Sequence, residues 1–286
     1  AIALFCAVGG VEPQSETVWR QADKYEVPRV AFVNKMDRAS RDPFEILDEI
    51  EEELKIEVRP LSWPIGMGND FKGVYDIYSQ KLKLFRPNEK SDDENSFIFD
   101  DLDDPDLNEA MGKDINTLKE DLELVDGVYP EFKHEEYQSA DITPVFFGSA
   151  LNNFGVQEIL DCFLDIAPNP VGGKAEERII KPGEEKFTGF VFKIHANLDP
   201  NHRDRIAFVR INSGIFKRNQ FYHHVRQDKQ IRFASPTAFM ASKKSVIDEA
   251  YPGDIVGLHD TGNFKIGDTL TEGEKIHFKG MPNFSP

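Results

Sequence analysis

A strand–helix–strand pattern in the first forty residues restricts the fold more than any other feature. Residues 2–8 are an apolar run, residues 13–25 have helical spacing with Val18, Ala22 and Tyr25 on one face, and residues 30–33 are a second apolar run. Two strands joined by a helix form a βαβ unit with parallel strands and a right-handed crossover. Two parallel strands do not make a stable sheet alone, so the sequence predicts an α/β domain with further strands.

The second of these strands ends in a polar cluster, Asn34-Lys35-Met36-Asp37. Ligands bind at the carboxyl edge of open α/β sheets. The Asp37 carboxylate can accept hydrogen bonds from the ring N–H and the exocyclic amine of guanine, a pair that adenine does not present. We therefore predict that Asp37 selects the base, that Asn34 joins neighbouring loops and faces the base, and that the Lys35 stem lies along the ring. A solvated turn after a strand would have the same appearance.

A second polar loop follows a later strand. Residues 143–147 are a short apolar run that ends in Gly148-Ser149-Ala150-Leu151, and a helix pattern follows. The backbone N–H groups of Ser149 and Ala150 are predicted to donate to the exocyclic oxygen of guanine. This short loop sequence alone predicts little, but together with Asn34–Asp37 it supports recognition of guanine. The sequence predicts no catalytic residue and no metal ligand, and the candidate nucleotide-binding residues are Asn34, Lys35, Asp37, Ser149, Ala150 and Leu151.

The chain is predicted to contain two domains. Residues 1–170 read as the α/β domain, with an acidic insertion at about 58–140, and residues 171–186 read as a linker with Gly and Pro pairs. Residues 187–286 contain short alternating strands separated by glycine-rich turns, which is typical of a small β-barrel. The predicted fold class is therefore an α/β domain with a parallel sheet, followed by an all-β barrel.

The net charge of −17 is unevenly distributed. Residues 42–140 carry −18, whereas residues 187–286 carry +4, so an argument against RNA from the whole chain does not apply to the barrel. The basic side chains of the barrel form either an ordinary solvated surface or a face that contacts RNA phosphates. They concentrate in its first half, at Arg203, Arg205, Arg210, Lys217, Arg218, Arg226, Lys229 and Arg232.

Three further observations bear on location and metals. No apolar run is long enough to span a bilayer, and the first residues read as a core strand rather than a signal peptide. Cys6 and Cys162 offer no disulfide framework, so we expect a protein of the reducing cytoplasm. We also expect it to bind neither a membrane nor DNA. The aspartates of residues 92–104 lack the glycine and terminal glutamate of an EF-hand loop, so they read as a solvated surface.

These residues resemble the translational GTPases. Asn34–Asp37 is similar to the guanine-recognition motif of that family, Gly148–Leu151 to its second base-contacting loop, and Asp204–Gly214 to the start of its second domain. The stretches Trp63–Gly66 and Phe187–Ile194, among others in residues 42–170 and 187–286, resemble bacterial peptide chain release factor three. Residues 7–21 instead resemble elongation factor G.

The resemblance implies a P-loop-NTPase-like GTP-binding (G) domain that binds GTP and GDP with Mg²⁺. It also implies a ribosome-associated GTPase that recycles class-one release factors at termination, with the barrel touching ribosomal RNA. No Gly-x-x-x-x-Gly-Lys-Ser/Thr phosphate loop occurs in the 286 residues. We therefore expect a truncated piece without Mg²⁺ ligands that is inactive as a GTPase alone. The alternatives are an elongation factor G type translocase and a non-catalytic module that binds RNA or protein.

Overall fold

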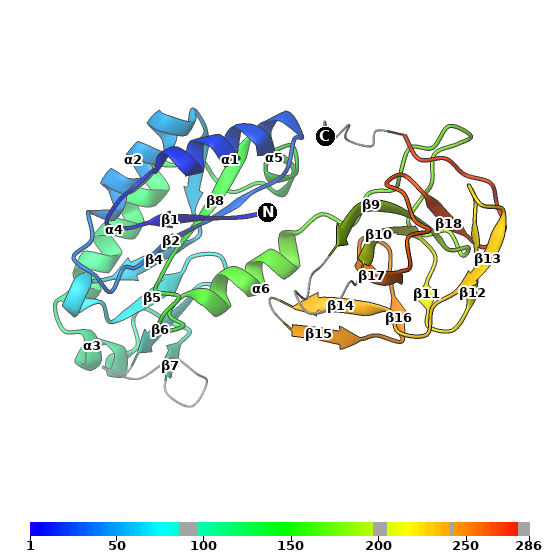
Figure 1. Ribbon diagram of the computed structural model, residues 1–286. Helices are drawn as coiled ribbons and strands as arrows, with labels where there is room; N and C mark the ends of the chain where they lie inside the picture. Colours follow the sequence, from blue (N-terminus) through cyan, green and yellow to red (C-terminus); the bar gives the residue numbers. More distant parts are fainter. Residues whose placement is uncertain (86–95, 197–204, 241–242, 280–286) are drawn as a thin grey trace. The chain divides into compact units, whose positions relative to one another are not determined.

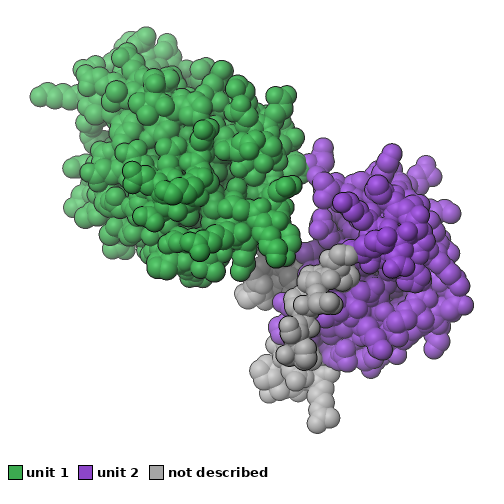
Figure 2. All heavy atoms as spheres, turned by 90° about the horizontal axis from the view of Figure 1, so that it is seen from above, with its two compact units in different colours: residues 1–168 green, residues 169–286 purple. Residues whose placement is uncertain are grey.

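The computed structural model describes residues 1–85, 96–196, 205–240 and 243–279 (Figure 1). The chain divides into two compact units, Ala1–Pro168 and Asn169–Pro286, which Figure 2 colours separately. In the described parts of the chain, no helix has the length and apolar character needed to cross a membrane.

The first unit contains the predicted parallel sheet. Its four strands lie in the order β1-β2-β8-β3, and every neighbouring pair is parallel. Non-consecutive strands are neighbours here because helices carry the chain back across the sheet, as the βαβ pattern predicts. The strands are β1 (Ile2–Cys6), β2 (Val30–Asn34), β8 (Ile142–Phe147) and β3 (Glu57–Pro60).

Helices cover both faces of this sheet, because alternate residues of its central strands point to opposite sides. Ala31 and Val33 of β2 pack in one apolar cluster with α2, whereas Val30 and Phe32 pack in another with α6. This is the expected reason for a continuous apolar run in a central strand. The helices of the unit outside the insertion are α1 (Pro13–Lys24), α2 (Pro43–Leu54) and α6 (Val156–Ile166).

Local signals explain where α2 begins and why it packs. The Asp42 side chain accepts a hydrogen bond of 2.9 Å from the Phe44 N–H, which satisfies one of the free donors of the first turn. The face of α1 that carries Val18 and Tyr25 is not the one that packs on the sheet. Trp19 is the buried residue of α1, while Val18 and Tyr25 are 57% and 70% exposed. The adjacent strand β1 lies at the edge of the sheet, so it buries only part of the helix.

The acidic segment between β3 and β8 forms a small subdomain of its own. Four antiparallel strands lie in the order β4-β5-β6-β7, and short helices follow. Residues 107–125 are shared between two helices, and residues 86–95 lie outside the described part. The elements are β4 (Ser62–Ile65), η1 (Gly68–Asp70), β5 (Gly73–Asp76), β6 (Lys81–Phe85), β7 (Ser96–Phe99), α3 (Pro105–Met111), α4 (Asp114–Val128) and α5 (His134–Gln138).

The second unit is the predicted β-barrel domain. Eight antiparallel strands lie in the order β13-β12-β18-β9-β10-β17-β14-β15, and β11 pairs with β16. Aromatic rings fill its core, with Phe187 and Phe216 both within 5.1 Å of Tyr222 between ring centroids. The strands are β9 (Thr188–Ala196), β10 (Arg205–Ser213), β11 (Phe216–Lys217), β12 (Phe221–His224), β13 (Lys229–Arg232), β14 (Thr237–Met240), β15 (Lys243–Val246), β16 (Glu249–Ala250), β17 (Ile255–Asp260) and β18 (Thr269–Thr271).

Residues 171–186, the predicted linker, belong to the second unit. Ala175 and Ile180 are buried in a small cluster with Ile276. The guanidinium of Arg178 donates to the carboxylates of both Glu184 and Glu274 at 2.7–2.8 Å. This segment is therefore packed on the chain that follows β18 rather than extended in solvent.

Candidate functional site

The carboxyl ends of three neighbouring strands form the candidate site. In the parallel register Cys6 at the end of β1 lies beside Asn34 at the end of β2, and Val33 lies beside Phe147 of β8. The loops that follow β2 and β8 therefore leave the sheet side by side. This brings together the two polar clusters that are more than a hundred residues apart in the sequence.

The Asn34 side chain ties these two loops together. Its Oδ1 accepts a hydrogen bond of 2.9 Å from the Ala150 N–H and one of 2.8 Å from the Lys35 N–H. The predicted joining of neighbouring loops by Asn34 is thus present. Because one oxygen accepts from both loops, the position of the second loop depends directly on the residue type at position 34.

Residues 35–37 form a turn that places alternate side chains outside. Met36 is fully buried, and its N–H donates to the Gly148 carbonyl at 3.0 Å. Lys35 adopts a φ of 73°, in the left-handed region that few non-glycine residues occupy. With Met36 anchored inside, Lys35 and Asp37 are directed away from the core and both line the cleft described below.

The loop after β8 closes on itself. Ser149 and Phe154 exchange two backbone hydrogen bonds of 2.9 Å. A Cβ on Gly148 would lie 2.1 Å from the Phe154 carbonyl oxygen, so the close approach requires glycine there. Loop closure gives the Ser149 and Ala150 N–H groups internal acceptors, on Phe154 and Asn34 respectively, and their donation to guanine stays a prediction. In the described part of the chain, the Leu151 N–H has no acceptor.

A cleft of about 630 Å³ lies over these strand ends. Five of the six candidate residues line it, and Ala150 contributes through its hydrogen bond to Asn34 instead. One carboxylate oxygen of Asp37 accepts from the Asn152 side chain at 3.2 Å. The lining residues are Cys6, Val8, Gly9, Asn34, Lys35, Asp37, Arg38, Ala39, Ser149 and Leu151.

Cys6 lines the cleft although sequence reasoning assigned it no role there. Burial by itself raises the pKa of the thiol, but the N–H groups of Gly9 and Val8 and the Lys35 ammonium stabilise the thiolate, and the net pKa is lowered. The signal that could have found Cys6 is its position. It ends the strand adjacent to β2, and the carboxyl ends of parallel strands meet at one sheet edge.

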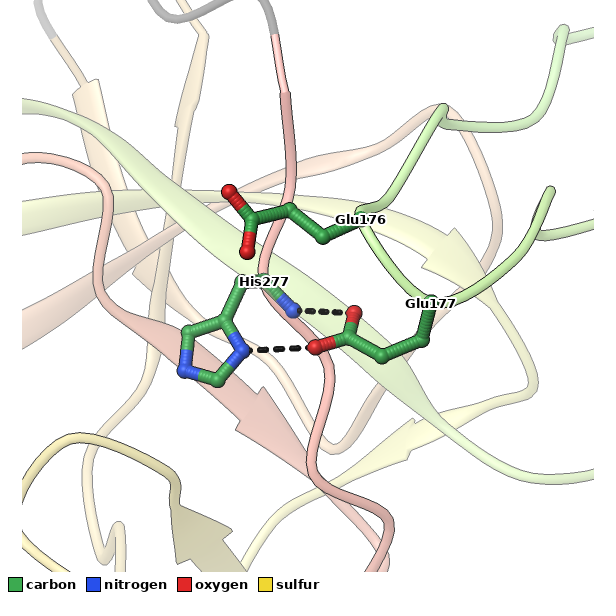
Figure 3. A group of neighbouring side chains, drawn as sticks. All are labelled: Glu176, Glu177 and His277. Carbon is green, nitrogen blue, oxygen red and sulfur yellow. Dashed lines mark hydrogen bonds and ion pairs between the residues drawn. The ribbon is translucent and has the colours of Figure 1, made fainter.

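A second group of polar residues lies in the barrel unit. Glu176, Glu177 and His277 have ligand atoms close enough for a metal ion, but all three are exposed (Figure 3). Both carboxylate oxygens of Glu177 accept from His277, one from the ring at 2.7 Å and one from the backbone N–H at 2.9 Å. These hydrogen bonds lower the pKa of Glu177 to about 2. The group therefore holds two chain segments together.

The basic residues of the barrel fall into two classes. Four of them pair with acidic side chains within the unit and so help to hold it together: Arg205 with Asp260, Lys217 with Glu249, Arg218 with Asp248 and Arg226 with Asp268. Arg203 lies outside the described residues. Within the described ranges, Arg210, Lys229 and Arg232 have no carboxylate partner.

Comparison with known families gives two matches. Residues 1–169 match the family model of the elongation factor Tu GTP binding domain. Residues 186–273 match the family model of elongation factor G domain 2. The first match spans the parallel sheet, the insertion and both polar loops, and the second spans most of the barrel.

Replacement of Asn34 tests whether it joins the two loops. Asn34→Ala removes the acceptor of the Ala150 N–H, so amide hydrogen exchange at Ala150 should accelerate roughly tenfold, as expected for loss of one hydrogen bond. Asn34→Asp keeps an oxygen at the same place and is the matched control, in which exchange should stay near the wild-type rate. Unchanged exchange in Asn34→Ala would show that other contacts fix the loop.

Proposed function

This chain belongs to the translational GTPase family, and on that premise we propose that its cleft binds the base of GTP and GDP within a release factor three type of factor. The observation that carries the base assignment is the hydrogen bond between the Ala150 N–H and the Asn34 side chain. It holds the two loops so that Asp37 and Leu151 line one cleft. The proposed nucleotide-binding residues are Asn34, Lys35, Asp37, Ser149, Ala150 and Leu151.

We base guanine specificity on the hydrogen-bond donors and acceptors of the base that would face Asp37. A carboxylate presents acceptors only, and guanine offers two adjacent donors, its ring N–H and its 2-amino group. Adenine presents a ring acceptor at the corresponding position, so its lone pair would face the negative charge of Asp37. The partner for the exocyclic oxygen of guanine is the Leu151 N–H, the loop donor without an internal acceptor in the described residues. The Lys35 stem would lie along the ring face.

The 286 residues contain no phosphate-loop motif that would bind the phosphates of the nucleotide. Phosphoryl transfer relies on a phosphate loop and Mg²⁺ for positioning and for neutralising charge. The 286 residues contain no Gly-x-x-x-x-Gly-Lys-Ser/Thr sequence, so we expect them alone to select the base but to hydrolyse GTP negligibly. GTP turnover that persists after repurification of the chain would contradict this expectation.

Asp37→Asn tests the assignment of base selectivity. The amide replaces an acceptor with a donor, so it should weaken GDP binding and favour XDP, because xanthine has an acceptor oxygen at C2 where guanine has an amine. The change in preference should be on the order of a hundredfold, since buried polar groups are left unpaired with the wrong base. Competition binding between GDP and XDP is the measurement. A preference that Asp37→Asn does not change would remove Asp37 from this role.

We further propose that the factor acts in termination, where it recycles class-one release factors from the ribosome, and that the barrel contacts ribosomal RNA. The similarity of residues 42–170 and 187–286 to release factor three supports termination. The likeness of residues 7–21 to elongation factor G supports the alternative, a translocase. One feature of the barrel suits RNA. Phe221 is 59% exposed, and the Arg232 guanidinium lies 5.6 Å from the centroid of its ring. Aromatic rings and arginine planes stack on unpaired bases.

Dissociation of a class-one release factor from the ribosome can test both the role in termination and the contact of the barrel with RNA. A factor that joins these 286 residues to a phosphate loop should, with GTP, speed dissociation of a labelled class-one release factor from ribosomes after termination. A Phe221→Ala and Arg232→Gln double variant should weaken ribosome binding roughly tenfold, because stacking on a base is lost. Lys217→Gln, which breaks only an exposed ion pair with Glu249, is the control. Accelerated tRNA movement instead of release would favour the translocase, and no effect would favour a non-catalytic binding module.

A further inference from the structure

We infer that Asn152 is a positioning residue that orients the Asp37 carboxylate for guanine, an inference that rests on the proposed function of the cleft. The Asn152 Nδ2 lies 3.2 Å from Oδ2 of Asp37 and 3.4 Å from Oγ of Ser149. Asn152 is not among the cleft-lining residues, so it acts through Asp37 rather than on the nucleotide.

The loop holds the Asn152 amide in place. Ser149 is buried, with 1% of its surface exposed, and it is fixed by its two backbone hydrogen bonds to Phe154. The side-chain amide of Asn152 has two N–H donors, and each has an acceptor here, one on Ser149 and one on Asp37. The amide thus connects a rigid point of the second loop to the carboxylate of the first.

This contact affects base recognition because the orientation of a carboxylate is otherwise loosely set. The terminal torsion of an aspartate is broad, with two-fold rather than three-fold preference. Paired recognition of guanine requires both oxygens of Asp37 to lie in the plane of the base. The Asn152 side chain donates to one oxygen of that carboxylate. If the plane of the Asp37 carboxylate is already fixed, less side-chain entropy is lost when guanine binds.

The hydrogen bond from Asn152 leaves the Asp37 carboxylate able to accept hydrogen bonds from guanine. An ionised carboxylate has about four lone-pair sites on its two oxygens. One hydrogen bond from Asn152 leaves Oδ2 a further site and leaves Oδ1 free of this donor. Asp37 can therefore accept from Asn152 and from both guanine donors at once. A negative charge at position 152 would instead face the Asp37 carboxylate at close range.

Two substitutions separate an orienting role from a structural one. Asn152→Ala removes the donor, so GDP affinity should fall roughly tenfold, the scale of a lost hydrogen bond to a charged group. Asn152→Asp keeps the shape of the side chain but places a carboxylate beside Asp37, so its loss should be larger still. A residue that only maintains loop shape would give the opposite order, because Asp fits the site of Asn better than Ala does.

The choice of nucleotides supplies a second readout. Inosine lacks the 2-amino group of guanine and so makes one fewer hydrogen bond to Asp37. If Asn152 holds the carboxylate for paired recognition, Asn152→Ala should lower GDP affinity more than IDP affinity, and the ratio of the two should shrink severalfold. Asn108→Ala is the control, because it makes the same change at an exposed asparagine of α3 whose side chain donates to the Asp104 carbonyl oxygen.

The experiment is an NMR titration of the full chain and its variants with GDP, IDP and ADP up to millimolar concentration. Binding is followed by the amide shifts of Asn34–Asp37 and Ser149–Asn152. We expect a GDP-to-IDP affinity ratio that falls in Asn152→Ala, falls further in Asn152→Asp and is retained in Asn108→Ala. Wild-type preference for GDP over ADP with an unchanged ratio in Asn152→Ala would overturn the role of Asn152 alone. A wild-type chain that does not prefer GDP to ADP would overturn the proposed function itself.

Discussion

The Asn34 side-chain oxygen accepts from the backbone of its own loop and from the backbone of the loop after β8, and the cleft depends on this pair of hydrogen bonds. The parallel register of β2 and β8 brings the loops close, but a register alone fixes no side chain. The buried Met36 and the closed Ser149–Phe154 loop supply the remaining anchors. The polar groups proposed to recognise a base are thus held in place by buried apolar residues and backbone hydrogen bonds.

The fold was predictable because each of its signals is local or periodic. Apolar runs marked β2 and β8, and glycine-rich alternating strands marked the barrel. The packing face of α1 was not predictable from spacing, since Trp19 is buried only because β1 lies beside it at the sheet edge. Helical periodicity reports which residues share a face and says nothing about what that face meets.

The sequence predicted which residues meet at this sheet edge, and their part in base binding stays a prediction. Strand-end position identified Asn34, Lys35 and Asp37, and the register of β2 with β8 brings their loop beside Ser149–Leu151. The internal hydrogen bonds of the Ser149 and Ala150 N–H groups were not predicted, because residue types do not show that the chain returns from Phe154 to Ser149. Asn152 was missed for the same reason. Its contact with Asp37 spans 115 residues and depends on a loop closure that only coordinates reveal.

We propose that Asp37 binds guanine through two hydrogen bonds, and a crystal structure of the protein with GDP bound would show them. The ring N–H and the 2-amino group of guanine should each lie about 3 Å from a carboxylate oxygen of Asp37. A base that occupies the cleft with its 2-amino edge turned away from Asp37, or a nucleotide bound elsewhere on the protein, would contradict it.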